Sequence, residues 1–149
     1  TFPQKMKIYK PNRKGFIIYV LAGLALLPLA SLTSIQQSIA SQLLAFFSLS
    51  IPFAIVLWTY ISTSYAIENK TLRYKSGLLH GNIEITKIRE IHHNTTMWAG
   101  TSKAATARKG MIIKYNKFDE LYISPVNNEE MISDLLLINK DIQVSKEES

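Results

Sequence analysis

Residues 16–32 read FIIYVLAGLALLPLASL, and residues 43–61 read LLAFFSLSIPFAIVLWTYI. These two apolar runs lie within residues 15–67, a stretch that contains no charged residue. Each run is close to the roughly 20 residues that a helix needs to cross the hydrocarbon core of a bilayer. The residues between the runs, 33–42, are polar but uncharged and few enough to make a turn. Residues 15–62 are therefore predicted to form a transmembrane helical hairpin.

Two other interpretations of these runs fit the sequence less well. Paired core helices of a soluble protein would need more surrounding chain than the 149 residues provide. A secretory signal peptide has a shorter apolar region, and no second span follows it. Neither run contains an aspartate, glutamate, lysine, arginine or histidine. This argues against a pump or a transporter of charged substrates, because such proteins usually need one within the membrane.

Basic side chains lie on one side of the predicted hairpin. Residues 33–42 contain no lysine or arginine, whereas basic residues precede the first run and follow the second: Lys5, Lys7, Lys10, Arg13 and Lys14, then Lys70, Arg73 and Lys75. By the positive-inside rule, both termini are predicted to be cytoplasmic. Basic and aromatic residues at this end of the runs are predicted to anchor the hairpin at the membrane interface: Lys10, Arg13, Lys14, Phe16, Tyr19, Trp58 and Tyr60.

The net charge of +6 is unevenly distributed along the chain. Residues 1–14 contain five basic residues and no acidic residue, whereas the remainder contains 12 basic and 11 acidic residues. Residues 1–14 are therefore predicted to be a basic cytoplasmic arm ahead of a nearly neutral domain, which argues against nucleic-acid binding. The chain has no cysteine, which excludes disulfides, thiolate catalysis and cysteine-ligated metals.

After residue 62 the pattern changes to short runs in which apolar and polar residues alternate, as is typical of strands. The clearest runs are 64–67 (SYAI), 72–76 (LRYKS), 83–91 (IEITKIREI), 111–115 (MIIKY) and 121–123 (LYI). A stripe of helical spacing follows: Met131, Ile132, Leu135, Leu136 and Ile138. Either of two residues could be the N-cap of this helix: Ser124, which precedes Pro125, or Asn127, with Glu130 three residues later.

The predicted fold class is therefore membrane-anchored α+β. The transmembrane hairpin is followed, at residues 63–142, by a curled antiparallel sheet or barrel of six or seven strands that a C-terminal amphipathic helix caps. The last residues, 143–149, are predicted to be a frayed polar tail.

The predicted domain resembles the bacterial pleckstrin-homology-like (PH-like) domains of small membrane proteins. The matching segments are Tyr65-Ala66-Ile67, Leu72-Arg73-Tyr74-Lys75-Ser76-Gly77, Gly81-Asn82-Ile83, Ile88-Arg89-Glu90-Ile91, residues 112–115, and Tyr122-Ile123-Ser124-Pro125 before the helix. The two-helix anchor also fits that group, some of whose members are bacteriocin-immunity proteins. The resemblance implies a binding scaffold rather than an enzyme, and a two-pass protein of the bacterial inner (cytoplasmic) membrane.

The longest irregular segment of the predicted domain, residues 94–110, is the main candidate for an interaction surface. It contains Trp98, a possible aromatic anchor, and the cations Lys103, Arg108 and Lys109. Arg73 and Lys75 on a predicted strand could extend this surface toward anionic lipid headgroups. Two alternatives stay open: a mobile loop whose tryptophan folds back on the barrel, and strand cations that only face solvent.

The sequence contains no pattern typical of a catalytic, cofactor-binding or metal site. His92 and His93 are adjacent, so a strand would direct them to opposite faces, and they could not easily chelate one ion. Neither a nucleophile elbow, nor a phosphate-binding loop, nor a dinucleotide fingerprint is present. The chain is therefore predicted not to be an enzyme and to carry no cofactor and no metal.

Three functions follow as hypotheses. The first is an adaptor that presents its cytoplasmic PH-like domain to a protein partner or to a second copy of the chain. The second is an immunity protein that counters a bacteriocin at the membrane through the hairpin and residues 33–42. The third is a sensor of anionic lipid headgroups, which would depend on Arg73, Lys75 and the cations of residues 94–110.

Overall fold

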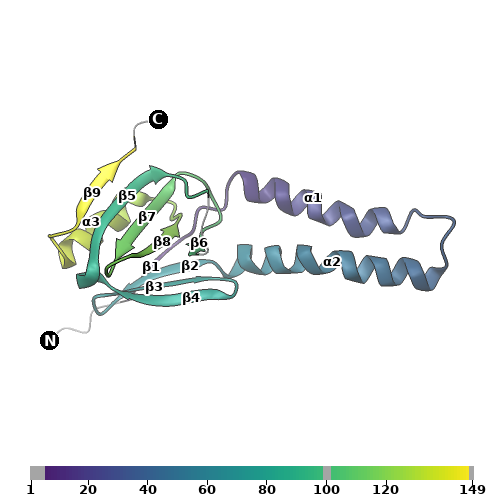
Figure 1. Cartoon of the computed structure of the whole chain (residues 1–149), viewed down its shortest axis with the longest axis horizontal. Helices are drawn as coiled ribbons and strands as arrows, with labels where there is room; N and C mark the ends of the chain where they lie inside the picture. Colours follow the sequence, from purple (N-terminus) through teal and green to yellow (C-terminus); the bar gives the residue numbers. More distant parts are fainter. Residues whose placement is uncertain (1–5, 99–101, 148–149) are drawn as a thin grey trace.

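The computed structural model describes residues 6–98 and 102–147 and places a helical hairpin at one end of a β-domain (Figure 1). Helix α1 (Phe16–Ser31) and helix α2 (Ile39–Ser62) lie side by side and project away from the strands. Helix α2 begins four residues earlier than the predicted span, because the side chain of Ser38 caps it by accepting a hydrogen bond from the Ser41 amide.

The helices expose apolar side chains along their length, and none of the most apolar part of α2 is buried within the chain. Among the described residues, α2 is the one helix long and apolar enough to cross a membrane. Helix α1 is equally free of charge but has 16 residues, or about 24 Å at 1.5 Å per residue, against a hydrocarbon core of about 30 Å. The hairpin is thus part of the structure, and its two-pass insertion stays a prediction.

The first sheet has four antiparallel strands in the order β1-β2-β3-β4. Their bounds are β1 Lys7–Tyr9, β2 Ser64–Glu68, β3 Thr71–Ser76 and β4 Leu79–Glu84. The β2–β3 turn uses Asn69 and Lys70 with φ of 49° and 63°, the left-handed conformations that a two-residue hairpin loop requires.

Strand β1 corrects the prediction of a separate basic arm. Lys7 to Tyr9 pair with Ile67 to Tyr65 of β2, so part of residues 1–14 belongs to the sheet. The two ends of the helical hairpin therefore continue into neighbouring strands, β1 before α1 and β2 after α2. This pairing couples the orientation of the domain to that of the hairpin.

The second sheet has five strands in the order β6-β8-β7-β5-β9. Their bounds are β5 Ile88–Thr95, β6 Lys103–Ala104, β7 Gly110–Tyr115, β8 Asp119–Ile123 and β9 Gln143–Lys146, and a short 3₁₀ helix, η1 (Ile85–Lys87), links the two sheets. Strand β9 pairs with β5, and β6 with β8, in parallel. The predicted polar tail is therefore partly a strand. Residues 63–142 contain seven strands, β2 to β8, in agreement with the predicted six or seven, and β1 and β9 lie outside that range.

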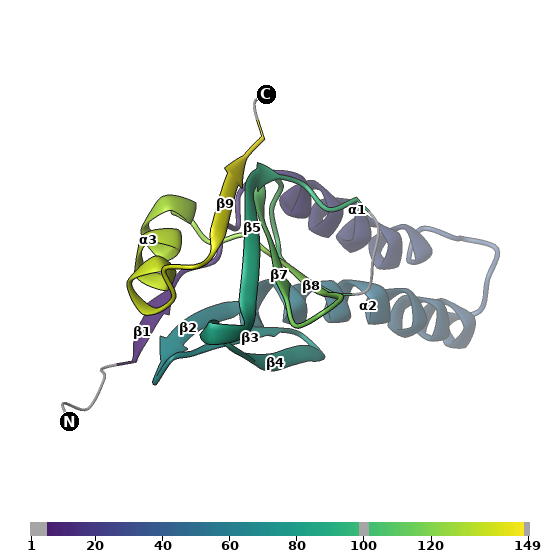
Figure 2. The same cartoon turned by 60° about the vertical axis from the view of Figure 1, so that its left-hand side comes forward.

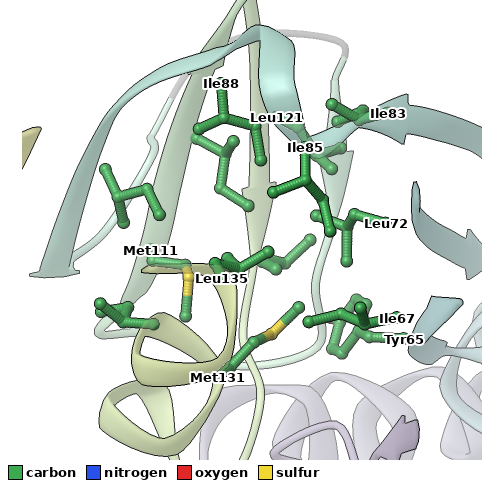
Figure 3. Packing of buried hydrophobic residues seen from close by; sticks show 14 of the residues in the cluster. Tyr65, Ile67, Leu72, Ile83, Ile85, Ile88, Met111, Leu121, Met131 and Leu135 are labelled. Carbon is green, nitrogen blue, oxygen red and sulfur yellow. The ribbon is translucent and has the colours of Figure 1, made fainter. Parts of the chain in front are cut away.

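Helix α3 (Asn128–Ile138) covers the core between the sheets. Asn127 is its N-cap and accepts a hydrogen bond from the Glu130 amide, which selects the second of the two predicted caps. Met131 and Leu135 point from α3 toward Ile67 and Leu72 of the first sheet (Figure 3). The α+β architecture with PH-like sheets and a C-terminal helix is thus confirmed.

Strand β1 also contacts α3, and Figure 2 shows the two elements next to each other. The Lys7 ammonium lies 2.5 Å from Asp134 and 2.9 Å from Glu130, and the Tyr9 hydroxyl donates a hydrogen bond to Asp134. Partial burial acts to raise the pKa of Asp134, but the hydrogen bonds from Lys7 and Tyr9 outweigh it, and the pKa is lowered. These contacts fix β1 to the helix that closes the core.

Candidate functional site

Three segments that are distant in sequence meet at the base of α1, where the helix joins the β-domain. The Asn12 amide donates to the Ser124 carbonyl at 2.7 Å, and the Val126 amide donates to the Lys10 carbonyl at 2.9 Å. The Thr106 hydroxyl donates to the Asn12 carbonyl at 2.6 Å. These bonds hold the segment before α1, the loop before β7 and the end of β8 together.

Two buried hydroxyl groups stabilise the same junction. Ser124 Oγ accepts hydrogen bonds from the amides of Thr106 and Ala107, both at 3.2 Å. The Tyr65 hydroxyl donates to the Ala104 carbonyl at 2.5 Å and accepts from the Ser124 amide at 3.2 Å. Burial raises the pKa of Tyr65 to about 12, so this hydroxyl keeps its proton and can serve as a donor at neutral pH. The segment at residues 104–107 is therefore fixed rather than mobile.

Replacing Tyr65 with phenylalanine is expected to destabilise the protein by about 1–3 kcal/mol, because a buried carbonyl and a buried amide lose their partner. Chemical unfolding of the full chain in mild detergent measures the loss, and faster amide hydrogen exchange at residues 104–107 would locate it. Tyr19→Phe is the matched control, since the Tyr19 side chain is exposed. Equal stability of the two variants would contradict the role given to the Tyr65 hydroxyl.

Arg108 connects this loop to the first turn of α1. Its guanidinium carbon lies 5.1 Å from the ring centroid of Phe16 and 5.0 Å from that of Trp98, within the range of cation–π attraction. Trp98 remains 75% exposed. The tryptophan therefore stays largely exposed and lies beside the first turns of α1.

Two hollows flank Arg108. One, of about 350 Å³, lies between Phe16, Ile17 and Val20 of α1 and the loop residues Trp98 and Ala105. The other, of about 510 Å³, lies on the side of Asn12, Lys14 and Tyr19 and reaches Lys109 and Asn128. The predicted surface cations Lys103, Arg108 and Lys109 are thus gathered around the first turns of α1, together with the predicted anchors Lys14, Phe16 and Tyr19.

The end of α2 is fixed to the β-domain from two sides. Arg13 donates a hydrogen bond to the Ile61 carbonyl at 2.9 Å and lies 5.4 Å from the Tyr60 ring centroid. On the other side, the Gly77 amide donates to Ser62 Oγ at 2.8 Å. A Cβ at Gly77 would meet Thr59 Oγ1 at 2.6 Å, and its φ is 61°, so glycine suits this close approach. Of the predicted anchors, Arg13 and Tyr60 are thus in direct contact.

The sequence pattern of the bacterial PH domain matches residues 63–139, from just before β2 to the end of α3. The chain belongs to the bacterial PH domain family. No curated protein and no solved structure matches the chain. The match does not include β1, the helical hairpin or β9.

Arg73 and Lys75 lie on a different face of the PH domain from the loop cations. They project from the outer face of β3 and line a hollow with Ile8 of β1 and Ala66 of β2. Arg73 is paired with Glu68 at 3.0 Å. The sequence grouped these two residues with Lys103, Arg108 and Lys109 because all are basic, whereas the fold divides them between two surfaces.

One cluster on the PH domain was not predicted. His92 Nδ1 lies 2.6 Å from Ser145 Oγ, and His92 Nε2 lies 2.6 Å from a Glu90 oxygen. Ser145, His92 and Glu90 match the residue types of a nucleophile, a base and an acid. His92 Nε2 and Glu90 are close but do not form a hydrogen bond, so Glu90 does not orient the imidazole as a catalytic acid would. Ser145 is exposed on β9, a strand that the sequence analysis assigned to the frayed tail.

Metal binding finds no support in the part of the chain that the structure describes. No group of three or more histidine, aspartate or glutamate side chains there could hold an ion.

Proposed function

We propose that this protein is a two-pass membrane protein whose bacterial PH domain is a non-enzymatic module that binds a protein partner on the cytoplasmic side. The helical hairpin supplies the anchor, and the outer face of the first sheet supplies the partner surface. The observation that carries this proposal is a face of β1–β4 that no described helix or strand covers and that carries large exposed apolar side chains next to cations.

The anchor is supported by the distribution of charge around the hairpin. Its helices expose leucine, isoleucine and phenylalanine, which in water would form an apolar surface much larger than soluble monomers tolerate. Basic residues lie at the domain end of the helices, and the α1–α2 connection has none. The positive-inside rule then places the PH domain in the cytoplasm.

The partner surface is built by one cross-strand row and its neighbours. Register aligns Ile8, Ala66, Arg73 and Asn82 across the four strands, and all four face outward. Ile8 is 64% exposed, and Met6 beside it is also exposed. An exposed apolar patch bordered by charge is typical of protein interaction sites.

The charges on this surface indicate the chemistry of the partner. Arg73 is balanced by Glu68, but among the described ion pairs none includes Lys75, which borders the same hollow. A partner segment with an apolar residue to pack against Ile8 and Met6, and an acidic residue to pair with Lys75, would complement both the apolar patch and the charge. The partner is therefore a protein, itself at or near the membrane, with an acidic and apolar segment.

Site-specific photo-crosslinking in native membranes tests this function. A crosslinking residue at position 8 is expected to capture one stoichiometric partner, and Lys75→Glu is expected to abolish the capture. The same residue at position 118 is the control, because Phe118 is 84% exposed on the β7–β8 turn, outside this surface. Equal capture from both positions, or capture of a second copy of the chain, would contradict the proposal.

The immunity hypothesis has no specific contact in its favour. The residues on which it depends, 33–42, form the α1–α2 connection and the first turn of α2, where Gln42 donates a hydrogen bond to the Ser34 carbonyl at 2.5 Å. This bond closes the hairpin and needs no toxin to explain it. The immunity role stays a prediction from the sequence.

A further inference from the structure

We propose that the hollow between the loop before β7 and helix α1 binds a single anionic phospholipid of the cytoplasmic leaflet. The inference rests on the proposed insertion of the hairpin into the membrane. It assigns a ligand to a surface distinct from the partner face of β1–β4.

The hollow combines two chemically different walls. Phe16, Ile17 and Val20 form an apolar wall along the first turns of α1. The opposite wall comes from the loop, where Trp98 and Ala105 are apolar and Lys103 and Arg108 carry charge. A phospholipid has the same division, with a phosphate at one end and acyl chains at the other.

The position of the hollow fits a lipid better than a soluble anion. Its apolar wall belongs to α1, which extends from Phe16 to Ser31 away from the PH domain. The apolar side chains of this helix are largely exposed. In a bilayer, this wall is continuous with the acyl region, whereas the cations lie at the headgroup level. A free phosphate would use only the cations and would leave the apolar wall without a partner.

The cations are available for a ligand. Among the described ion pairs, none includes Lys103, Arg108, Lys14 or Lys109, whereas Lys7, Arg73, Lys87 and Lys114 all have acidic partners. The guanidinium of Arg108 is also within cation–π distance of two rings, those of Phe16 and Trp98, which restrict its position. A preorganised cation loses less conformational entropy when it binds a phosphate.

Hydrogen bonds to the rest of the domain hold residues 104–109 of the charged wall in place. Ala104 is bonded to Tyr65, and Thr106 and Ala107 are bonded to Ser124, on both sides of Ala105. The Lys109 amide donates to Thr96 Oγ1 at 3.0 Å, which fixes the far end of the loop. The site is therefore specified by the fold, and not only by net charge.

Native mass spectrometry of the full chain from nanodiscs containing phosphatidylglycerol and phosphatidylcholine tests the inference. We expect one phosphatidylglycerol to be retained in preference to phosphatidylcholine. The double variant K103Q/R108Q is expected to weaken this retention about tenfold or more, because each close cation contributes to the attraction. The matched control K87Q/R89Q removes the same charge at the start of β5 and is expected to change retention less than twofold.

A charge-neutral variant separates a defined site from general attraction to an anionic surface. Ala105→Phe places a ring in the hollow without altering charge and is expected to abolish lipid retention. Its thermal unfolding, measured in parallel, shows whether the fold is intact. Retention that survives Ala105→Phe in a folded protein, or equal retention of both lipids, overturns the inference.

Failure of the lipid site can be distinguished from failure of the proposed membrane anchor. Extraction of the chain from membranes by alkaline carbonate would refute the membrane anchor itself. A chain that resists extraction but retains no phosphatidylglycerol would refute only the lipid site. Competition by millimolar inorganic phosphate, with full displacement of the lipid, would identify a phosphate site and overturn the choice of a lipid ligand.

Discussion

Replacing Gly110 with alanine is expected to destabilise the PH domain by about 3 kcal/mol or more, at or above the upper end of the usual range for overpacking a core. A Cβ at this position would lie 2.1 Å from the Ile123 carbonyl oxygen and 3.0 Å from the Ser124 Cα. Both contacts are with backbone, so no side-chain rotation can relieve them. Strands β7 and β8 would have to separate where Met111 pairs with Ile123.

The same substitution would disturb the junction with the hairpin. The Gly110 amide donates a hydrogen bond to the Tyr122 hydroxyl at 3.1 Å, and that hydroxyl donates to the Ala107 carbonyl at 2.8 Å. A shift of Gly110 would therefore reach the loop that carries Arg108. Thermal unfolding in mild detergent, followed by circular dichroism in the β-sheet region, measures the effect.

Gly23→Ala is the matched control for this prediction. Gly23 lies in α1, and a Cβ there would meet no atom within 4 Å. Alanine favours a helix by up to about 1 kcal/mol over glycine, so this variant is expected to be neutral or slightly more stable. An unfolding midpoint of Gly110→Ala equal to that of Gly23→Ala would show that β7 and β8 can separate at little cost.

The sequence predicted the elements whose signals are local. The strand over residues 72–76 and the apolar stripe of α3 follow from residue types and periods within a few positions. The choice between two N-caps needed the structure, because Ser124 and Asn127 both suit a cap. Ser124 proved to be occupied in bonds with residues 106 and 107.

Strands β1 and β9 could not be predicted in the same way. Each is only three or four residues long, and each is formed by pairing with a partner distant in sequence: Lys7 with Ile67, and Ser145 with His92. All four residues of β9 are exposed, so no apolar alternation identifies it. Such strands depend on the edge that the rest of the fold offers, which is long-range information.

The candidate site was predicted in composition but not in arrangement. Trp98 and the cations of residues 94–110 were selected from the sequence, whereas Phe16 was assigned only to the membrane interface. The structure brings both Phe16 and Trp98 within cation–π distance of the Arg108 guanidinium. The contact crosses from the hairpin to the PH domain, and no spacing rule within one segment could have indicated it.

Leu135→Ala is expected to destabilise the domain by about 2–5 kcal/mol, the range for removing a buried leucine side chain from a core. Leu135 is fully buried on the inner face of α3, near Met131 and Met111 in Figure 3. Its loss leaves a cavity between the helix and the sheets, and α3 can only partly collapse into it. The helix is restrained because Asp134 is bonded to Lys7 and Tyr9 of β1.

Leu137→Ala is the control on the same helix, since Leu137 is 77% exposed and its truncation removes little buried area. Chemical unfolding of both variants in mild detergent is expected to show a lower midpoint for Leu135→Ala alone. Equal midpoints would mean that α3 is not part of the cooperative core. In that case β1, which is bonded to α3 through Asp134, would lose this support. The coupling of the PH domain to the hairpin would then depend on β2 and on the contacts of Arg13 and Gly77 with the end of α2.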